Sequence, residues 1–106
     1  MHEAFEITND KKAHRLEVKL DGETAFADYR ITRGGIVFPH TVVPEAFRGR
    51  GVASALVVEG LKLARELKLK VIPLCSFFAG YIARHPEFAD QVHPRYRDRV
   101  EAARKV

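Results

Sequence analysis

The sequence has a single cysteine, Cys75, among 106 residues, and it has no tryptophan. One cysteine excludes an intrachain disulfide and a zinc site built from clustered cysteines. No apolar run approaches the ~20 residues that are needed to cross a bilayer. The first residues, MHEAFE, are acidic and short of apolar side chains, which argues against a secretory signal. We therefore expect a cytoplasmic protein without a membrane segment.

The length and charge limit the classes of protein that remain. A chain of 106 residues without repeats or linkers predicts one domain over 1–106. Eighteen Lys and Arg against 14 Asp and Glu give a net charge of +4, which favours anionic partners such as a nucleotide cofactor and points only weakly to nucleic acid. The histidines show no metal-ligand spacing, so we predict no metal site.

The first half of the chain has the period of β-strands. Apolar and charged residues alternate over 13–20, and Asp21-Gly22 then predicts a two-residue hairpin turn. Further strands are expected over 23–32 and 36–43, separated by a glycine turn at 33–35. A short strand over 5–8 is predicted to precede them.

The period then changes to that of a helix beginning at about Val52. Its predicted apolar face consists of Ala53, Leu56, Val57, Gly60, Leu61, Ala64 and Leu67. A short strand over 71–74 and a second amphipathic helix over 77–84 follow. A strand, a helix and a strand in this order form a right-handed βαβ crossover with parallel strands. We therefore predict an α/β (α+β) fold, with a mixed, mainly antiparallel sheet and a central β-α-β unit.

Two prolines fall in the strands that should be parallel neighbours. Pro39 lies in the strand before the helix and Pro73 in the strand after it. Each lacks the N–H group that a central ladder position needs. The two strands are therefore expected to separate at these residues, with a pair of edge bulges as the alternative.

The segment 43–53 (VPEAFRGRGVA) connects the strand over 36–43 to the first helix. Such a unit directs unpaired backbone N–H groups and the positive end of a helix dipole toward one place. Gly49 and Gly51 let a phosphate approach the backbone, and Arg48 and Arg50 add positive charge. A bound pyrophosphate is one interpretation, and an ordinary basic loop that caps a helix is the other. The segment has neither the Walker A sequence nor the third glycine of a dinucleotide-binding fingerprint.

Three segments together resemble the GNAT superfamily of N-acetyltransferases, in particular its small single-domain branch. They are 40–44 (HTVVP), 48–53 (RGRGVA) and 73–88 (PLCSFFAGYIARHPEF). The order Arg48-x-x-Gly51-x-Ala53 is similar to the acyl-CoA loop of that family, Gln/Arg-x-x-Gly-x-Gly/Ala. The resemblance covers roughly residues 13–92 and implies the acyl-CoA N-acyltransferase fold. The chain departs from the pattern at Val42, where the branch often has an acidic residue, and at Ser76, where it often has proline.

The resemblance implies an N-acetyltransferase that uses acetyl-CoA as co-substrate and an amine as acceptor. The pyrophosphate would lie on the backbone of the loop, and the pantetheine arm would lie against the strand before it. The implied cofactor-binding residues are Val42, Val43, Arg48, Gly49, Arg50, Gly51, Val52 and Ala53. The acceptor, whether a protein lysine, a polyamine or a small metabolite amine, and the oligomeric state both stay open.

Three residues are candidates for catalysis. Tyr81 resembles the tyrosine that protonates the leaving thiolate in GNAT enzymes, and the alternative is a core tyrosine with its hydroxyl at the surface. With Ser76 as N-cap, Cys75 would lie at a helix N-terminus, a position that favours thiolate. It could form an acetyl-cysteine, line the acetyl pocket, or be a small buried hydrophobe. His40 is the candidate general base or a hydrogen-bonded core residue, and His85 is expected to cap a helix.

Two other classes of function remain. One is a CoA-binding protein without transferase activity, an interpretation that Val42 supports. The other is a small basic module that binds nucleic acid, which would need exposed aromatic side chains among the basic ones. Phe47, beside Arg48 and Arg50, is the only sequence feature of that kind.

Overall fold

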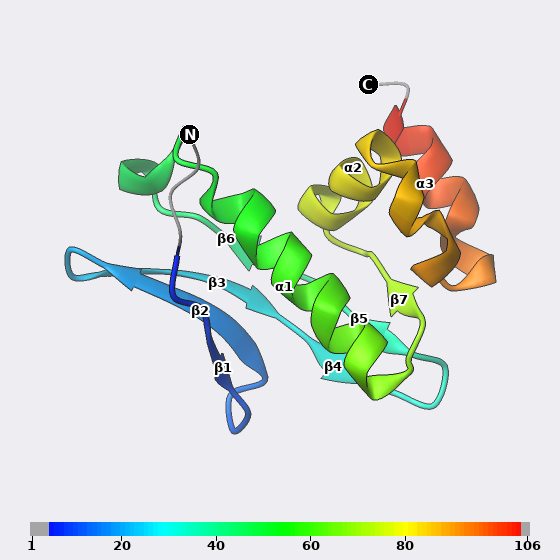
Figure 1. Ribbon diagram of the computed structural model, residues 1–106, viewed down its shortest axis with the longest axis horizontal. Coiled ribbons are helices and arrows are strands. Elements are labelled where there is room, and N and C mark those ends of the chain that lie inside the picture. Colours follow the sequence, from blue (N-terminus) through cyan, green and yellow to red (C-terminus); the bar gives the residue numbers. More distant parts are fainter. Residues whose placement is uncertain (1–4, 105–106) are drawn as a thin grey trace.

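The computed structural model describes residues 5–104 (Figure 1). Its strands are β1 (Thr8–Asp10), β2 (Arg15–Leu20), β3 (Glu23–Asp28), β4 (Arg30–Ile31), β5 (Ile36–Val37), β6 (Thr41–Val42) and β7 (Val71–Ile72). Its helices are α1 (Val52–Leu67), α2 (Ser76–Arg84) and α3 (Arg97–Arg104), with 3-10 turns at Glu45–Phe47, Pro86–Gln91 and Pro94–Tyr96. Within the described residues, none of the helices is long and apolar enough to cross a membrane.

The strands form two adjoining sheets. The larger is antiparallel in the order β1-β2-β3-β6, and the smaller has the order β4-β5-β7, with β5 and β7 parallel. The predicted hairpin turn is confirmed, because Asp21 and Gly22 both have positive φ angles, 52° and 80°, as a type I′ turn requires. The predicted mixed fold with its β-α-β unit is confirmed as well: α1 connects the β5–β6 segment to β7 (Figure 1).

Several strand boundaries differ from the prediction. The strand expected over 71–74 ends at Ile72, directly before Pro73. The strand expected over 23–32 is interrupted at Tyr29, whose N–H group donates to the carbonyl of His14 and whose hydroxyl donates to Asn9. The strand expected over 36–43 is divided into β5 and β6 around Pro39. The first strand begins only at Thr8, where pairing with Glu17 starts, instead of extending over 5–8.

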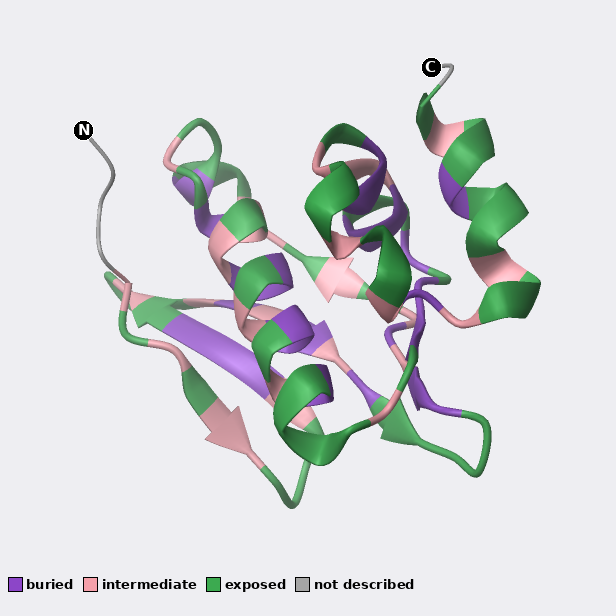
Figure 2. Ribbon diagram, turned by 45° about the vertical axis from the view of Figure 1, so that its right-hand side comes forward, coloured by how far each residue is buried: buried purple, intermediate pink, exposed green. Residues whose placement is uncertain are grey.

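Helix α1 packs its apolar side on the strands, as Figure 2 shows by the burial of its inward-facing positions. The buried residues are Val52, Leu56, Val57, Gly60, Leu61 and Ala64. The predicted face was therefore nearly right: Val52 replaces Ala53, and Leu67 is exposed at the end of the helix. Behind α1 the rings of Phe38 and Phe78 stack with centroids 4.1 Å apart, and this pair joins α2 to the core.

Candidate functional site

The parallel strands β5 and β7 separate after two paired residues. Their register ends at Val37 and Ile72, and the Cys75 N–H group donates to the carbonyl of Phe38 at 2.9 Å. Beyond this point the chain turns away at Pro39, and β6 pairs antiparallel with β3. The expected separation at the two prolines is confirmed, because β6 pairs with β3 and belongs to a different sheet from β7. We call the place between β6 and the end of β7 the strand gap.

Cys75 and Thr41 face each other across the strand gap. The Cys75 thiol donates to Oγ1 of Thr41 at 3.2 Å, and Cys75 is only 8% exposed. Cys75, with φ −79° and ψ 135°, occupies the N-cap position of α2, so the prediction of Ser76 as the N-cap was wrong by one residue. The extended backbone needed at an N-cap lies at Cys75, because this residue still bonds to Phe38. The thiol therefore lies at the start of α2, in a largely buried position.

The loop before α1 is shaped by two left-handed glycines. Gly49 has φ 77° and Gly51, the N-cap of α1, has φ 80°. A Cβ atom built on either would have no other described atom within 4 Å, so the space in front of the loop is open. The first turn of α1 contains no acidic residue and receives no side-chain cap within residues 5–104. The first N–H groups of a helix also lack intrahelical partners, and this end of α1 can therefore hold an anion.

The backbone N–H groups of two predicted cofactor-binding residues already donate hydrogen bonds within the loop itself. The N–H group of Arg48 donates to the carbonyl of Glu45, and the N–H group of Arg50 donates to that of Phe47. The N–H groups of Arg48 and Arg50 are therefore already used, whereas the first N–H groups of α1 lack intrahelical partners. Both arginine side chains still add positive charge near the loop.

A groove of about 650 Å³ connects this loop to the strand gap. We call it the loop groove, and its lining residues are Thr41, Val42, Val43, Phe47, Arg48, Gly49, Gly51, Val52, Ala53, Ser54 and Phe77. It brings together all the sequence-predicted cofactor residues except Arg50. Sequence reasoning missed Phe77 and Thr41: the first is 44% exposed despite its size, and the second is recognisable only through its contact with Cys75.

None of the three predicted catalytic residues lines the loop groove, and Cys75 is connected to it only through its contact with Thr41. Tyr81 stacks on His85 with ring centroids 3.9 Å apart and lines a second hollow, beside the N-terminal half of α1. His40 is exposed and lines a separate polar hollow of about 270 Å³, together with His14 and Asp28. His85 occupies the C-cap of α2, as expected, and its Nδ1 atom lies 2.9 Å from the Tyr81 carbonyl oxygen.

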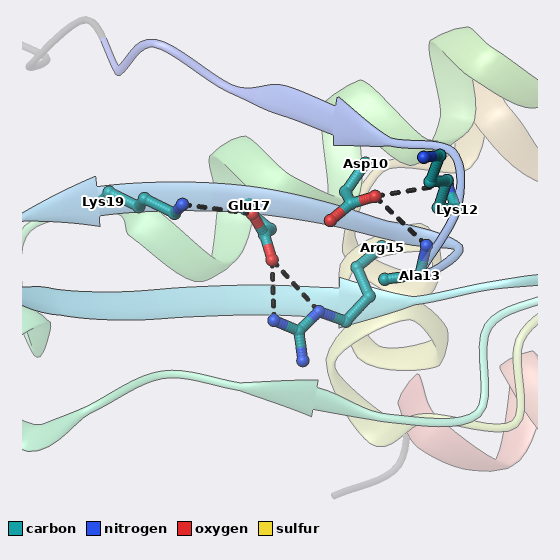
Figure 3. Close-up of polar contacts among 6 residues, drawn as sticks. All are labelled: Asp10, Lys12, Ala13, Arg15, Glu17 and Lys19. Atoms are coloured by element: carbon teal, nitrogen blue, oxygen red, sulfur yellow. Dashed lines mark hydrogen bonds and ion pairs between the residues drawn. The ribbon is translucent and has the colours of Figure 1, made fainter.

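A charged cluster lies on the larger sheet, apart from the loop groove (Figure 3). Arg15 donates to the buried carboxylate of Glu17 at 2.6 Å, and Lys19 adds a longer ion pair at 3.9 Å. The hydrogen bond to Glu17 raises the pKa of Arg15 above its ordinary value. Asp10 accepts from the N–H groups of Lys12 and Ala13. These bonds stabilise the β1–β2 turn and the sheet, and none of the six residues lines the loop groove.

Metal chemistry has no visible site in this part of the chain. Within residues 5–104, no group of three or more His, Cys, Asp or Glu side chains could hold a metal ion. The site is thus defined by an uncapped helix, a strand gap and one thiol.

These features define the protein as one with the acyl-CoA N-acyltransferase fold. They are a mixed sheet with a β-α-β unit, a glycine-rich loop at a helix N-terminus and a gap between parallel strands. A family model described as GCN5-related N-acetyl-transferase matches residues 15–91. The chain belongs to this family.

Proteins named NATD1 from several vertebrates are similar to the chain over most of their length. Protein NATD1 of Homo sapiens is 30% identical over 98 residues, which cover 90% of this chain and 81% of that protein. Protein NATD1 of Gallus gallus is 30% identical over 95 residues, covering 85% and 86%. Protein NATD1 of Xenopus tropicalis is 28% identical over 101 residues, covering 92% and 87%.

Proposed function

We propose that the protein binds acetyl-CoA as a co-substrate and transfers its acetyl group to an amine. The observation that carries this proposal is the continuity of the loop groove, which extends from the uncapped N-terminus of α1 to Thr41 at the strand gap. An anion site at one end and a largely buried thiol beside the other suit a ligand that has a pyrophosphate and a thioester. Membership of the GCN5-related family supports the same assignment.

Different residues of the loop groove would bind different parts of the cofactor. The backbone of Gly51, Val52 and Ala53 would bind the pyrophosphate, with charge added by Arg48. The pantetheine arm would lie against Val42 and Val43, on the edge of β6 that faces away from β3. Phe77, exposed on the opposite wall, would cover the arm.

Acetyl transfer would take place at the strand gap. The attacking amine must be neutral, the thioester carbonyl must be polarised as it becomes an oxyanion, and the leaving thiolate must be stabilised or protonated. A main-chain N–H group at the edge of β6 would polarise the carbonyl. Cys75 would line the acetyl pocket or take up the acetyl group before the amine does, and Thr41, in contact with its sulfur, would orient it.

A second function has one specific observation in its favour. His40 lines a hollow other than the loop groove, and Val42 provides no carboxylate, so the groove itself contains no general base among its lining residues. A protein that binds acetyl-CoA without transferring the acetyl group fits this arrangement. The nucleic-acid interpretation has lost its only sequence feature, because Phe47 is 1% exposed and its ring is unavailable for stacking on a base.

The test combines binding and turnover. Calorimetric titration with acetyl-CoA should give saturable binding with 1:1 stoichiometry. Release of the CoA thiol should then be measured with a panel of spermidine, lysine-containing peptides and small primary amines. Binding and amine-dependent thiol release together support transfer, whereas binding without release for any amine supports the second function. Absence of binding contradicts both.

A further inference from the structure

Two interruptions of the sheets meet at the polar hollow that His40 lines. One lies between β3 and β4, at Tyr29, and the other lies between β5 and β6, around Pro39. The N–H group of Asp28 donates to the carbonyl of His40 at 2.9 Å, and the N–H group of Tyr29 donates to the carbonyl of His14. These bonds hold three segments around a cavity of about 270 Å³, which we call the His40 hollow. Its lining residues are Ala13, His14, Asp28, Tyr29, Arg30, Pro39 and His40.

The His40 hollow has one carboxylate and one guanidinium in its lining, those of Asp28 and Arg30. Neither forms an ion pair, with the other or with any other residue, in the part of the chain that the structure describes. Arg15 is opposite Asp28 in the β2–β3 register, but its guanidinium is bound to Glu17 at 2.6 Å (Figure 3). Two opposite charges are therefore available to a ligand on the walls of one small cavity.

The His40 hollow lies beside the strand gap but is separate from the loop groove. His40 directly precedes Thr41, whose hydroxyl contacts the thiol of Cys75, and consecutive Cα atoms are only about 3.8 Å apart. The hollow and the loop groove share no lining residue. A cofactor in the groove would leave the hollow open, and a second ligand in the hollow would lie next to the place of acetyl transfer.

The charges and the size of the hollow suit the backbone end of a free amino acid. A carboxylate accepts hydrogen bonds from an ammonium group, and a guanidinium binds a carboxylate through two parallel hydrogen bonds. A free α-amino acid has both groups on one carbon atom, whereas a residue inside a peptide has neither. The hollow is smaller than the ~300–1,000 Å³ of sites for drug-sized ligands, as a site for a single amino acid would be.

We propose that the His40 hollow binds the acceptor of acetyl transfer and that this acceptor is a free diamino acid, such as lysine or ornithine. This inference rests on the proposed function. Asp28 binds the α-ammonium group and Arg30 binds the α-carboxylate, so the α-amine is held in its protonated, unreactive form. The side-chain amine, at the end of a flexible stem, extends past His40 to the strand gap.

The reaction then acetylates the side-chain amine alone. The neutral amine forms a C–N bond to the acetyl carbonyl carbon as the C–S bond of the thioester breaks, and the proton that the amine loses is gained by the CoA thiolate. A polyamine has no carboxylate for Arg30, and a lysine within a protein has no α-ammonium group for Asp28. The two charges therefore distinguish among the kinds of acceptor that the sequence left open.

The test measures kcat/KM for free L-lysine, for spermidine and for Nα-acetyl-lysine amide, in which the α-amine and the α-carboxylate are both neutralised. Free lysine should be the best acceptor, and mass spectrometry of the product should place the acetyl group on its side chain. Asp28→Asn and Arg30→Gln should each raise KM for lysine roughly ten- to a hundred-fold, as loss of a hydrogen bond to a charged group does. Both should change kcat and acetyl-CoA affinity little. Arg33→Gln, which removes an exposed arginine outside the hollow, is the matched control and should behave as wild type does.

Different failures have different meanings. Equal kcat/KM for the three amines, acetylation of the α-amine, or an unchanged KM in either variant would overturn the assignment while the proposed function stands. If no amine releases the CoA thiol, the proposed function fails, and calorimetric titration with L-lysine still tests the hollow. Saturable binding that both variants weaken would then support the amino-acid site, and absence of binding would overturn it. Arg30 is exposed, so Arg30→Gln decides the matter should Asp28→Asn fail to fold.

Discussion

The Sγ atom of Cys75 lies 3.2 Å from Oγ1 of Thr41, across a gap where two parallel strands have separated. The two residues belong to segments that pair with different neighbours, Thr41 with β3 and Cys75 with the carbonyl of Phe38. The thiol is thereby held at the inner end of the strand gap, next to the N-terminus of α2. This position makes it the first residue to test for covalent chemistry.

If Cys75 takes up the acetyl group, wild type incubated with acetyl-CoA should gain one acetyl group on that residue. Intact-protein and peptide mass spectrometry measure this directly. Cys75→Ala should show no adduct and should lose amine-dependent turnover by at least about a hundred-fold. Turnover that survives in Cys75→Ala would contradict the covalent route and leave the cysteine as part of the pocket wall.

Thr41→Val tests the partner of the thiol without changing the volume of the side chain much. Removal of a hydrogen bond of this kind costs ~0.5–1.5 kcal/mol, so we expect turnover to fall about two- to ten-fold while acetyl-CoA affinity is kept. Steady-state kinetics and calorimetry would separate the two effects. An unchanged turnover number would show that the contact only packs the gap.

The cofactor loop can be tested at Gly51, where a side chain would enter the open space in front of α1. Gly51→Glu should abolish measurable acetyl-CoA binding, because it adds bulk and negative charge at the anion site. Gly22→Glu is the matched control: Gly22 has the same φ of 80° and equally open surroundings, but it lies in the β2–β3 turn. Each substitution should cost ~1–2 kcal/mol of stability for the left-handed backbone, and only the first should affect binding. Equal binding by both variants would refute the loop assignment.

Local sequence signals predicted the parts of the fold that local chemistry determines. Asp21-Gly22 specified a type I′ turn, the 3.6-residue period specified the buried side of α1, and two prolines indicated where parallel pairing stops. These features depend on backbone dihedral angles and on donors that a proline lacks. They can be read without knowledge of the rest of the chain.

The placement of individual side chains at the site was less predictable. Tyr81 and His40 lie outside the loop groove because their directions depend on how α2 rotates over Phe38 and on the break between β5 and β6. Phe77 and Thr41 line the groove for the same tertiary reasons. A sequence pattern gives the face of a helix or strand, whereas the cavity that the face borders depends on packing against distant segments.

The parallel pair that precedes the strand gap depends on Gly35. A Cβ atom at this position would lie 2.3 Å from the carbonyl oxygen of Lys70, the same oxygen that accepts from the Ile36 N–H group. Because this neighbour is backbone, Gly35→Ala should lower the free energy of unfolding by more than about 3 kcal/mol. Gly34→Ala, whose Cβ would meet its nearest atoms at 3.9 Å, should be nearly neutral in chemical denaturation. Similar midpoints for the two variants would contradict the close approach.

The contact between α1 and the stacked rings of Phe38 and Phe78 depends on Gly60. A Cβ atom there would lie 2.8 Å from Phe78 and 3.0 Å from Phe38, so Gly60→Ala overfills the core at a cost of ~1–3 kcal/mol. Alanine also gains about 1 kcal/mol of helix propensity, and we expect a net loss of stability. Gly80→Ala in α2 is the control, because its Cβ would meet only the mobile end of Arg84 at 3.3 Å and the propensity gain should remain. Thermal unfolding should therefore place Gly60→Ala below wild type and Gly80→Ala at or above it. The reverse order would mean that the two rings yield to the added methyl group and that the packing of α2 on α1 is looser than the stacked geometry implies.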